Sequence, residues 1–374
     1  MDSMEPFRHL YLHIPFCHHK CGYCDFNAYA GMDRLMPEYV AALQRELEAA
    51  RERFPFGALR TVYLGGGTPS LLPPGLASKV LDGVRRLFTV EPGAEVTLEA
   101  NPASTDPERL AAWREGGVNR LSIGVQGFDP AVLAVLERRT DGAQSARAFR
   151  QARDAGFRNI SLDLIFGVPG QTPESWEETV RSAMALEPEH LSCYCLTFEP
   201  GTLLTRRRDA GRLREVDADG QWDLLEHADR LLAHGGWRRY EVSSWARPGF
   251  RSRHNRAYWA CRSVYGAGAG AHSYATWGAS RRARRWWNAA RPRDYIAASP
   301  APEVDGEELD APLARAERVL LGLRTVRGLR PPAGLESELR ELEAAGLVRR
   351  HDSWVAPTRR GLDLHNQIAL AVLP

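Results

Sequence analysis

The sequence predicts an α/β fold in which helices cover a largely parallel β-sheet. Short β-rich runs alternate with longer amphipathic patterns six times over the first two-thirds of the 374 residues, as repeated strand–helix units do. The runs are mostly apolar, which is typical of strands buried on both faces. Unusual polar residues follow the strands, at the edge where such sheets bind ligands.

The six predicted strands each lead into a predicted helix. The strands are expected at 9–14, 59–67, 94–102, 120–126, 159–170 and 190–200. The helices are expected at 36–54, 74–88, 106–117, in two stretches that end by 157, at 172–187 and at 220–237. Thr172 and Ser175, with Pro173 between them, form an N-terminal capping pattern for one of these helices. The pattern alone does not separate an open doubly wound sheet from a partial barrel.

After Trp245 the regular alternation stops. Residues 254–296 are rich in aromatic residues, Arg and Gly, and 298–312 is expected to be a linker or an exposed loop. The tail then predicts a helix, a second helix, a hairpin at 348–357 and a final helix at 359–372. This order suits a small α+β, winged-helix-like module, and a packing role is favoured over DNA binding because no basic recognition helix stands out. We therefore expect domains at 1–245, 246–300 and 301–374.

The net charge and the N-terminal sequence limit which partners and which cellular compartment we expect. Lys plus Arg number 49 and Asp plus Glu 47, a net charge of +2, which gives no electrostatic reason to expect nucleic acid as a partner. Residues 1–16 lack the basic segment and the apolar core of a signal peptide, and no apolar run approaches the roughly 18 residues of a membrane span. We expect a cytoplasmic protein whose membrane association, if it has one, is peripheral only.

Three of the six cysteines form a cluster with the spacing C-x3-C-x2-C: Cys17, Cys21 and Cys24. A loop of this length can place three thiolates around one [4Fe–4S] cubane, one on each of three irons. Structural zinc normally takes four ligands, often as two separated pairs, so it fits this spacing poorly. The pattern favours a cluster whose fourth iron is open to a small molecule.

This motif, with the aromatic Tyr23 before its last cysteine, resembles that of the radical S-adenosylmethionine (SAM) enzymes. In that superfamily SAM chelates the open iron of the cluster. The segments "LYLHIPFC", "YLGGGTPS", "LEANP", "SIGVQGF", "LDLIFGVPGQT" and "LSCYCLTFEPGT" resemble, in order, the branch that contains oxygen-independent coproporphyrinogen III oxidase. The resemblance implies a partial (β/α)6 TIM-like barrel followed by a small C-terminal domain. It also implies a SAM pocket formed by Tyr11, Tyr23, Gly66, Gly67, Thr68, Glu99, Gln126, Arg138, Asp163 and Thr197.

Two members of this branch are alternatives for the function: the oxidase, which decarboxylates porphyrinogen propionates, and the HemW-type heme chaperones. The oxidase has a further cysteine two residues after the motif, where this chain has Phe26, and a long extension before its first strand, where only about ten residues precede Tyr11. The resemblance therefore favours the HemW-type group, which implies binding of heme and its transfer to an acceptor hemoprotein such as a respiratory cytochrome. Whether the chain is also an enzyme stays open.

The HemW-type group carries the motif H-N-x-x-Y-W, which is present here as His254, Asn255, Tyr258 and Trp259. An imidazole can ligate heme iron and aromatic rings can pack on a macrocycle, so these four residues are the expected heme site. Arginines beside Trp286 and Trp287 are a second candidate for binding heme propionates, although a solvated charged face is the more common role of such a run. They are Arg281, Arg282, Arg284 and Arg285.

The remaining cysteines carry no clear signal. Cys193 and Cys195 share one face of a predicted strand and are expected to be small buried hydrophobic residues rather than ligands. Cys261 lies beside the aromatic segment and has no assigned role.

Overall fold

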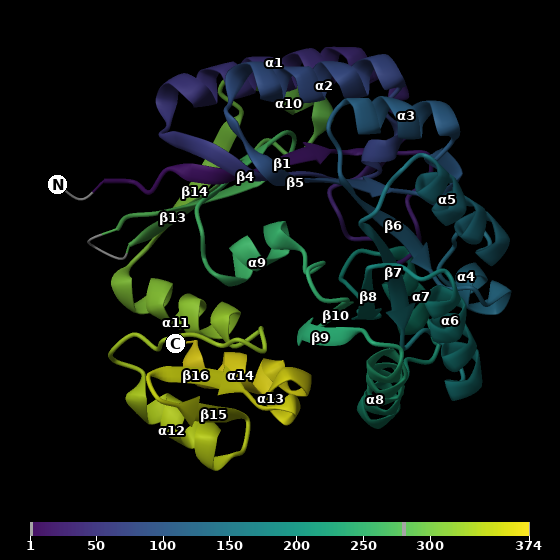
Figure 1. The fold of residues 1–374 in the computed structure, drawn as a ribbon, viewed down its shortest axis with the longest axis vertical. Coiled ribbons are helices and arrows are strands. Elements are labelled where there is room, and N and C mark those ends of the chain that lie inside the picture. The colour runs from purple at the N-terminus through teal and green to yellow at the C-terminus, as the bar shows by residue number, and fades with distance from the viewer. Residues whose placement is uncertain (1–2, 279–281, 374) are drawn as a thin grey trace.

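The computed structural model describes residues 3–278 and 282–373. Its centre is a curved twelve-stranded sheet with the order β14-β13-β12-β11-β1-β4-β5-β6-β7-β8-β10-β9 (Figure 1). Six consecutive strands of this sheet pair in parallel. They are β1 (Phe7–Ile14), β4 (Phe56–Gly66), β5 (Val90–Ala100), β6 (Arg120–Gln126), β7 (Ile160–Phe166) and β8 (His190–Cys195).

Helices follow the parallel strands and lie along the outer side of the curved sheet (Figure 1). They are α1 (Met36–Arg53), α2 (Pro74–Leu87), α3 (Pro107–Glu115), α4 (Pro130–Val135), α5 (Gly142–Asp154), α6 (Pro173–Ala185), α7 (Leu203–Asp209) and α8 (Ala218–His234). The sheet curves without closing, since β14 and β9 remain its two edges. The α/β prediction is confirmed, and of its two forms the structure is the partial (β/α)6 barrel.

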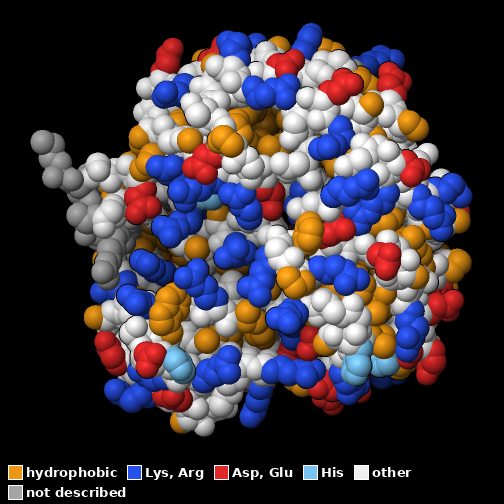
Figure 2. All heavy atoms as spheres, in the orientation of Figure 1, with side chains coloured by type: hydrophobic (Ala, Val, Ile, Leu, Met, Phe, Trp, Pro, Cys, Tyr) orange, Lys and Arg blue, Asp and Glu red, His pale blue; other side chains and the backbone are white. Residues whose placement is uncertain are grey.

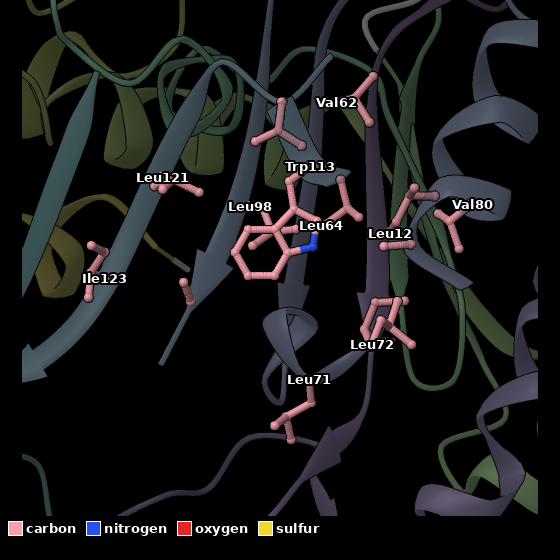
Figure 3. Close-up of a cluster of buried hydrophobic side chains, with 14 of the residues drawn as sticks. Leu12, Val62, Leu64, Leu71, Leu72, Val80, Leu98, Trp113, Leu121 and Ile123 are labelled. Carbon is pink, nitrogen blue, oxygen red and sulfur yellow. The ribbon is translucent and has the colours of Figure 1, made fainter. Parts of the chain in front are cut away.

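The core lies between the outer face of the sheet and these helices. Leu12, Leu64 and Leu98 come from three neighbouring strands and are 0–1% exposed, and Trp113 of α3 covers them (Figure 3). Val80 of α2 adds to the same cluster. Burial of large apolar side chains is the main favourable contribution to folding, at about 25 cal/mol per Å² of apolar surface. The apolar runs of the sequence are therefore the strands that form the barrel.

The predicted start of α6 is also confirmed. Thr172 is the N-cap residue: its side chain accepts a hydrogen bond from the Ser175 backbone N–H, and the Ser175 side chain bonds the Thr172 backbone in return. Pro173 follows directly and needs no N–H partner in the first turn. The chain therefore enters this helix at a position fixed by its own local sequence.

Further strands extend the sheet on both sides. β9 (Arg238–Glu241) and β10 (Ser244–Ala246) add an antiparallel pair next to β8. On the other side β11 runs parallel to β1, and the strands after it are antiparallel. The remaining elements of this region are α9 (Arg253–Trp259), β11 (Val264–Ala267), β12 (His272–Thr276), β13 (Ala283–Asn288), α10 (Pro292–Ala298) and β14 (Glu303–Leu309).

The prediction of a linker or loop at 298–312 is wrong, because Glu303–Leu309 forms β14 at the edge of the main sheet. Glu303 and Glu307 pair with Arg284 and Arg285 of β13. Acidic side chains on an exposed edge strand look like a loop in the sequence, whereas cross-strand ion pairs stabilise them as a strand.

The C-terminal module has a small core of its own, which includes Val319, Leu342, Val355 and Ile368. Its helices and hairpin appear in the predicted order, except that the final helix is two helices that meet at Leu364. Its elements are α11 (Ala311–Gly322), α12 (Glu336–Ala344), β15 (Val348–His351), β16 (Trp354–Pro357), α13 (Arg359–Asp363) and α14 (His365–Val372).

The module packs against the end of the barrel. The buried ion pair between Arg239 and Asp363 joins β9 to α13, and Arg324 Nε donates to Glu241 Oε2 at 3.0 Å. Within the described ranges no helix combines the length and the apolar character that crossing a lipid bilayer requires.

Candidate functional site

The carboxyl ends of the parallel strands open into a cavity of about 730 Å³. We call it the cluster cavity. It is lined by all three clustered cysteines and by nine of the ten predicted SAM residues. These are Cys17, Cys21, Cys24, Tyr23, Gly66, Gly67, Thr68, Glu99, Gln126, Arg138, Asp163 and Thr197.

The cysteine loop begins where β1 ends and is closed by a small parallel sheet of β2 (Phe16–Cys17) and β3 (Tyr29–Ala30). Within the loop the Cys24 backbone N–H donates to the Cys21 carbonyl at 3.1 Å. Cys17 is 7% exposed, the other two are half-buried, and all three thiols are free. The fold therefore presents three thiols to one cavity without any disulfide.

Three thiols that line one cavity can each bind a different iron of a cubane. In the described part of the chain no group of three His, Cys, Asp or Glu side chains is placed to hold one metal ion. Burial raises the pKa of Cys17 and raises that of Cys24 to about 11. Arg138 Nη1 lies 3.7 Å from Cys21 Sγ and Thr68 Oγ1 lies 3.3 Å from Cys17 Sγ. Such donors stabilise bound thiolates from the second sphere.

The glycine turn after β4 lets two backbone segments approach each other. Gly66 has φ +111°, which favours glycine. A Cβ on Gly67 would lie 2.7 Å from the carbonyl oxygen of Phe16, the residue before Cys17. The turn therefore packs directly on the cysteine loop. This packing is a second reason for glycine at these positions, besides the expected close approach of a ligand.

Glu99 is held at the end of β5 by two donors. Tyr63 OH donates to its Oε1 at 2.8 Å, and the Gly66 backbone N–H donates to its Oε2 at 3.1 Å. Burial raises the pKa of Glu99 to about 7, and the charge of Asp163 adds to the effect. Its protonation therefore changes near neutral pH.

Alternate residues of β6 face the cavity, and three of these four residues carry polar side chains. Arg120, Ser122, Gly124 and Gln126 all line the cavity, as the two-residue period of a strand requires. Ser122 Oγ donates to Asp163 Oδ2 at 2.8 Å, and burial raises the pKa of Asp163. This alternation was the signal by which Arg120 and Ser122 could have been found in the sequence.

Arg120 is a buried cation that the sequence analysis missed. It is 2% exposed and forms no ion pair with another described residue. Its charge lowers the pKa of both Glu99 and Asp163. The cavity therefore combines two half-buried carboxylates with one buried guanidinium.

Tyr11 is the one predicted SAM residue outside the lining. Its ring stacks on that of Tyr63 with centroids 6.1 Å apart, and its hydroxyl bonds His13 Nδ1 at 3.1 Å. It supports the wall of the cavity from behind Tyr63.

The four residues of the H-N-x-x-Y-W motif lie on α9 and do not converge on one cavity. Asn255 lines the cluster cavity, whereas Trp259 lines a second cavity on the other side of the helix. His254 is 1% exposed; its Nδ1 bonds Thr61 Oγ1 at 2.7 Å, and its Nε2 has no hydrogen-bond partner. Tyr258 packs edge-on against the His254 ring at 5.1 Å.

α9 is anchored to the barrel at its first turn. Ser252 Oγ accepts from the Asn255 backbone N–H at 3.2 Å, and the Glu95 carboxylate accepts from the backbone N–H groups of Arg253 and His254 at 3.0 Å. Burial lowers the pKa of His254 to about 3, so its imidazole is neutral. A buried carboxylate at a helix N-terminus holds this helix in place.

The arginine run beside Trp286 is engaged in the sheet. Arg284 pairs with Glu303 and Glu308, and Arg285 with Glu307 and Glu317. Arg281 lies outside the described residues. Arg284 and Arg285 therefore serve the β13–β14 pairing.

The other cysteines divide between core and cavity. Cys193 is 1% exposed in the main core, as expected, whereas the half-buried Cys195 lines the cluster cavity. Cys261 is half-buried at φ +48°, just after α9.

Comparison with known proteins identifies the fold. A model of the radical SAM superfamily matches residues 11–183, which span the cysteine loop and the first strands of the barrel. The solved coproporphyrinogen III oxidase HemN of Escherichia coli, described as a radical SAM enzyme, superposes with a TM-score of 0.83 over 98% of this chain and 90% of that one. At 23% identity this likeness shows the fold alone. Together these features define a radical SAM domain.

Curated relatives resolve the family further. The heme chaperone HemW of Mycobacterium tuberculosis is 39% identical over 99% of this chain and 95% of its own length. The Bacillus subtilis protein of the same name is 34% identical over 97% and 98%, and that of Escherichia coli 39% identical over 71% and 70%. The chain therefore belongs to the heme chaperone HemW family within the radical SAM superfamily.

Proposed function

We propose that this chain is a cytoplasmic heme chaperone that carries a [4Fe–4S] cluster with SAM and passes heme to an acceptor hemoprotein, such as a respiratory cytochrome. The single observation that carries the proposal is the identity of 39% with a heme chaperone over 99% of this chain. The relatives of Mycobacterium tuberculosis and Bacillus subtilis match 99% and 97% of this chain, and so cover the C-terminal module as well as the barrel. The proposal therefore concerns the whole chain.

In this proposal Cys17, Cys21 and Cys24 hold the cluster. A bound cluster supplies an open iron for SAM and a one-electron reductant. Arg138 and Thr68 hydrogen-bond two of the cysteine sulfurs, which stabilises their thiolate form.

The other lining residues are proposed to bind SAM around the open iron. Glu99 and Asp163 supply carboxylate oxygens for its amine and hydroxyl groups, and Gln126 supplies a side-chain amide. The glycine turn supplies backbone groups. Tyr11, Tyr23 and Thr197 complete the set, Tyr11 through its contact with Tyr63.

Heme is proposed to bind at α9. Asn255 and Trp259 already line cavities, whereas His254 and Tyr258 lie in the wall between them. His254 Nε2 lacks a hydrogen-bond partner and its imidazole is neutral, two properties of an available ligand nitrogen. Because the side chain is 1% exposed, coordination of iron by His254 requires α9 to move.

The oxidase activity is the alternative function. Phe26 occupies the position at which the oxidase has its further cysteine, and its side chain is 62% exposed at the rim of the cluster cavity. A phenyl ring offers neither a thiol nor a hydrogen bond to a substrate there. This residue favours the chaperone.

One experiment separates the two functions. A single anaerobically reconstituted preparation is titrated with heme and is also assayed for protoporphyrinogen formation from coproporphyrinogen III. We expect a saturable Soret-band change and no porphyrinogen product. Formation of porphyrinogen product in the presence of SAM and a reductant would show that the protein is an oxidase and not a chaperone. Absence of heme binding would refute the proposal.

A further inference from the structure

A second cavity lies between α9 and the C-terminal module and has a volume of about 290 Å³. We call it the arginine cavity. Six arginines line it: Arg251, Arg256, Arg262, Arg318, Arg327 and Arg330. Figure 2 shows Lys and Arg side chains gathered over α9 and α11 in the middle of this face. A chain with a net charge of only +2 thus concentrates positive charge at one hollow.

These six guanidinium groups have no anionic partner among the residues that the structure describes. None forms an ion pair with another described residue. Two neighbouring arginines differ, because Arg324 pairs with Glu241 and Arg239 with Asp363. The acidic residues of the junction between barrel and module are therefore already used, and the cavity keeps an excess of positive charge.

Aromatic rings hold several of the arginines in place. Arg327 and Arg330 lie over the Trp354 ring at 5.1 and 5.8 Å, and Arg251 lies over Tyr240 at 5.6 Å. Stacking on a ring fixes the plane of a guanidinium while its N–H groups remain free to donate. Because Trp354 and Tyr240 also line the cavity, it combines flat apolar walls with oriented donors.

The arginine cavity is connected to the heme motif through one residue. Trp259, the last residue of the motif, lines it on the side of α9, whereas Asn255 faces the cluster cavity. The C-terminal module completes the lining with Arg318 of α11 and with Trp354 of β16. A ligand in this cavity would contact both the motif and the module.

We propose that the arginine cavity binds the propionate edge of heme, an inference that rests on the proposed function. Guanidinium groups bind carboxylates with charge-assisted and often bidentate hydrogen bonds. The aromatic lining suits the flat macrocycle next to those carboxylates.

The size of the cavity limits how much of the ligand enters it. Cavities that enclose drug-sized ligands measure roughly 300–1,000 Å³, and heme is large on that scale. About 290 Å³ holds one edge of a heme. The rest of the macrocycle stays outside, which leaves it within reach of an acceptor.

The test compares heme with heme dimethyl ester, the same macrocycle with both propionates esterified. The variant is the double substitution Arg256→Gln with Arg318→Gln, because these two exposed arginines come from α9 and α11 and no ring contact holds either of them. The matched control is Arg147→Gln with Arg150→Gln, which removes two exposed arginines from α5 on the outside of the barrel. Each protein is titrated by the Soret band after thermal unfolding has shown that it is folded.

We expect the cavity variant to bind heme about 10- to 100-fold more weakly than wild type and the control to bind it normally. Wild type should bind the ester more weakly than heme by a similar factor, and the cavity variant should bind heme and the ester with equal affinity. Wild type that binds heme and ester equally, or a cavity variant with unchanged heme affinity, would overturn the inference while leaving the chaperone function intact.

Two further outcomes would refute this inference, and each would point to a different alternative. Loss of heme binding in Asn255→Ala but not in the arginine variant would place the macrocycle in the cluster cavity. Arginine-dependent binding of ATP together with arginine-independent binding of heme would assign the cavity to a nucleotide. Wild type that binds no heme would refute this inference together with the proposed function.

Discussion

The two cavities that meet at α9 carry charge in different ways. The cluster cavity is lined by poorly solvated groups whose charge depends on pH: the thiols of Cys17 and Cys24, with raised pKa values, and Glu99, with a pKa of about 7. The arginine cavity is lined by exposed guanidinium groups, which stay charged at any working pH. The charge of one site thus changes with protonation, whereas the other site stays positively charged.

Replacing Cys21 by Ser should abolish the cluster, because two thiolates cannot hold a cubane in place of three. Iron and sulfide analysis of anaerobically reconstituted protein should fall from about four of each per chain to near zero. Cys261→Ser, which removes a half-buried thiol outside the cluster cavity, should keep both. A full cluster in Cys21→Ser would contradict the assignment.

Glu99→Gln should weaken SAM binding to the reconstituted protein by about 10- to 100-fold, because a buried hydrogen bond to a charged group is lost. Isothermal titration with SAM measures the effect. Glu52→Gln, an exposed residue of α1, is the matched control and should bind SAM as wild type does. An unchanged SAM affinity in Glu99→Gln would remove this carboxylate from the proposed site.

SAM affinity in wild type should rise up to about tenfold between about pH 6 and pH 8. Burial raises the pKa of Glu99 to about 7, so the carboxylate is mainly protonated at the lower pH and ionised at the higher one. Asp163, Arg120 and Tyr63 face it and contribute to this value. Titration of Glu99→Gln over the same range isolates the effect from protonation of SAM itself. The variant should give a flatter profile, and parallel profiles would disprove the role of Glu99.

Added salt should weaken heme binding a few-fold between low ionic strength and roughly 0.5 M, since exposed charges are screened within a few ångströms at high salt. SAM binding in the buried cluster cavity should change less. The arginine double variant should lose most of the salt dependence, and the α5 control should keep it. Equal salt dependence in the variant and the control would show that the screened charges lie elsewhere.

The barrel and its active edge could be predicted from local patterns. The apolar run of β1 and the N-cap of α6 each depend on a few neighbouring residues of the sequence, and three cysteines within eight residues indicate a site by their spacing alone. β14 could not be predicted, because its acidic side chains become a strand only opposite the arginines of β13. Sequence patterns also gave no indication that His254 is buried against Thr61, a partner 193 residues away.

The arginine cavity could not be predicted from the sequence, because its residues come together only in the folded chain. Its charged residues are scattered from Arg251 to Arg330 and never form a run. By contrast, the visible run at Arg284 and Arg285 is neutralised by glutamates of β14 and α11. Whether an arginine is paired depends on the tertiary neighbours of that residue.

One short helix separates these two cavities, and this has a thermodynamic consequence. α9 has seven residues, with Asn255 on one side and Trp259 on the other. A ligand that displaces α9 when it binds in one cavity must change the volume of the other cavity. The binding free energies of SAM and heme are then linked. The linkage is reciprocal, so the factor by which bound SAM changes the affinity for heme equals the factor by which bound heme changes the affinity for SAM.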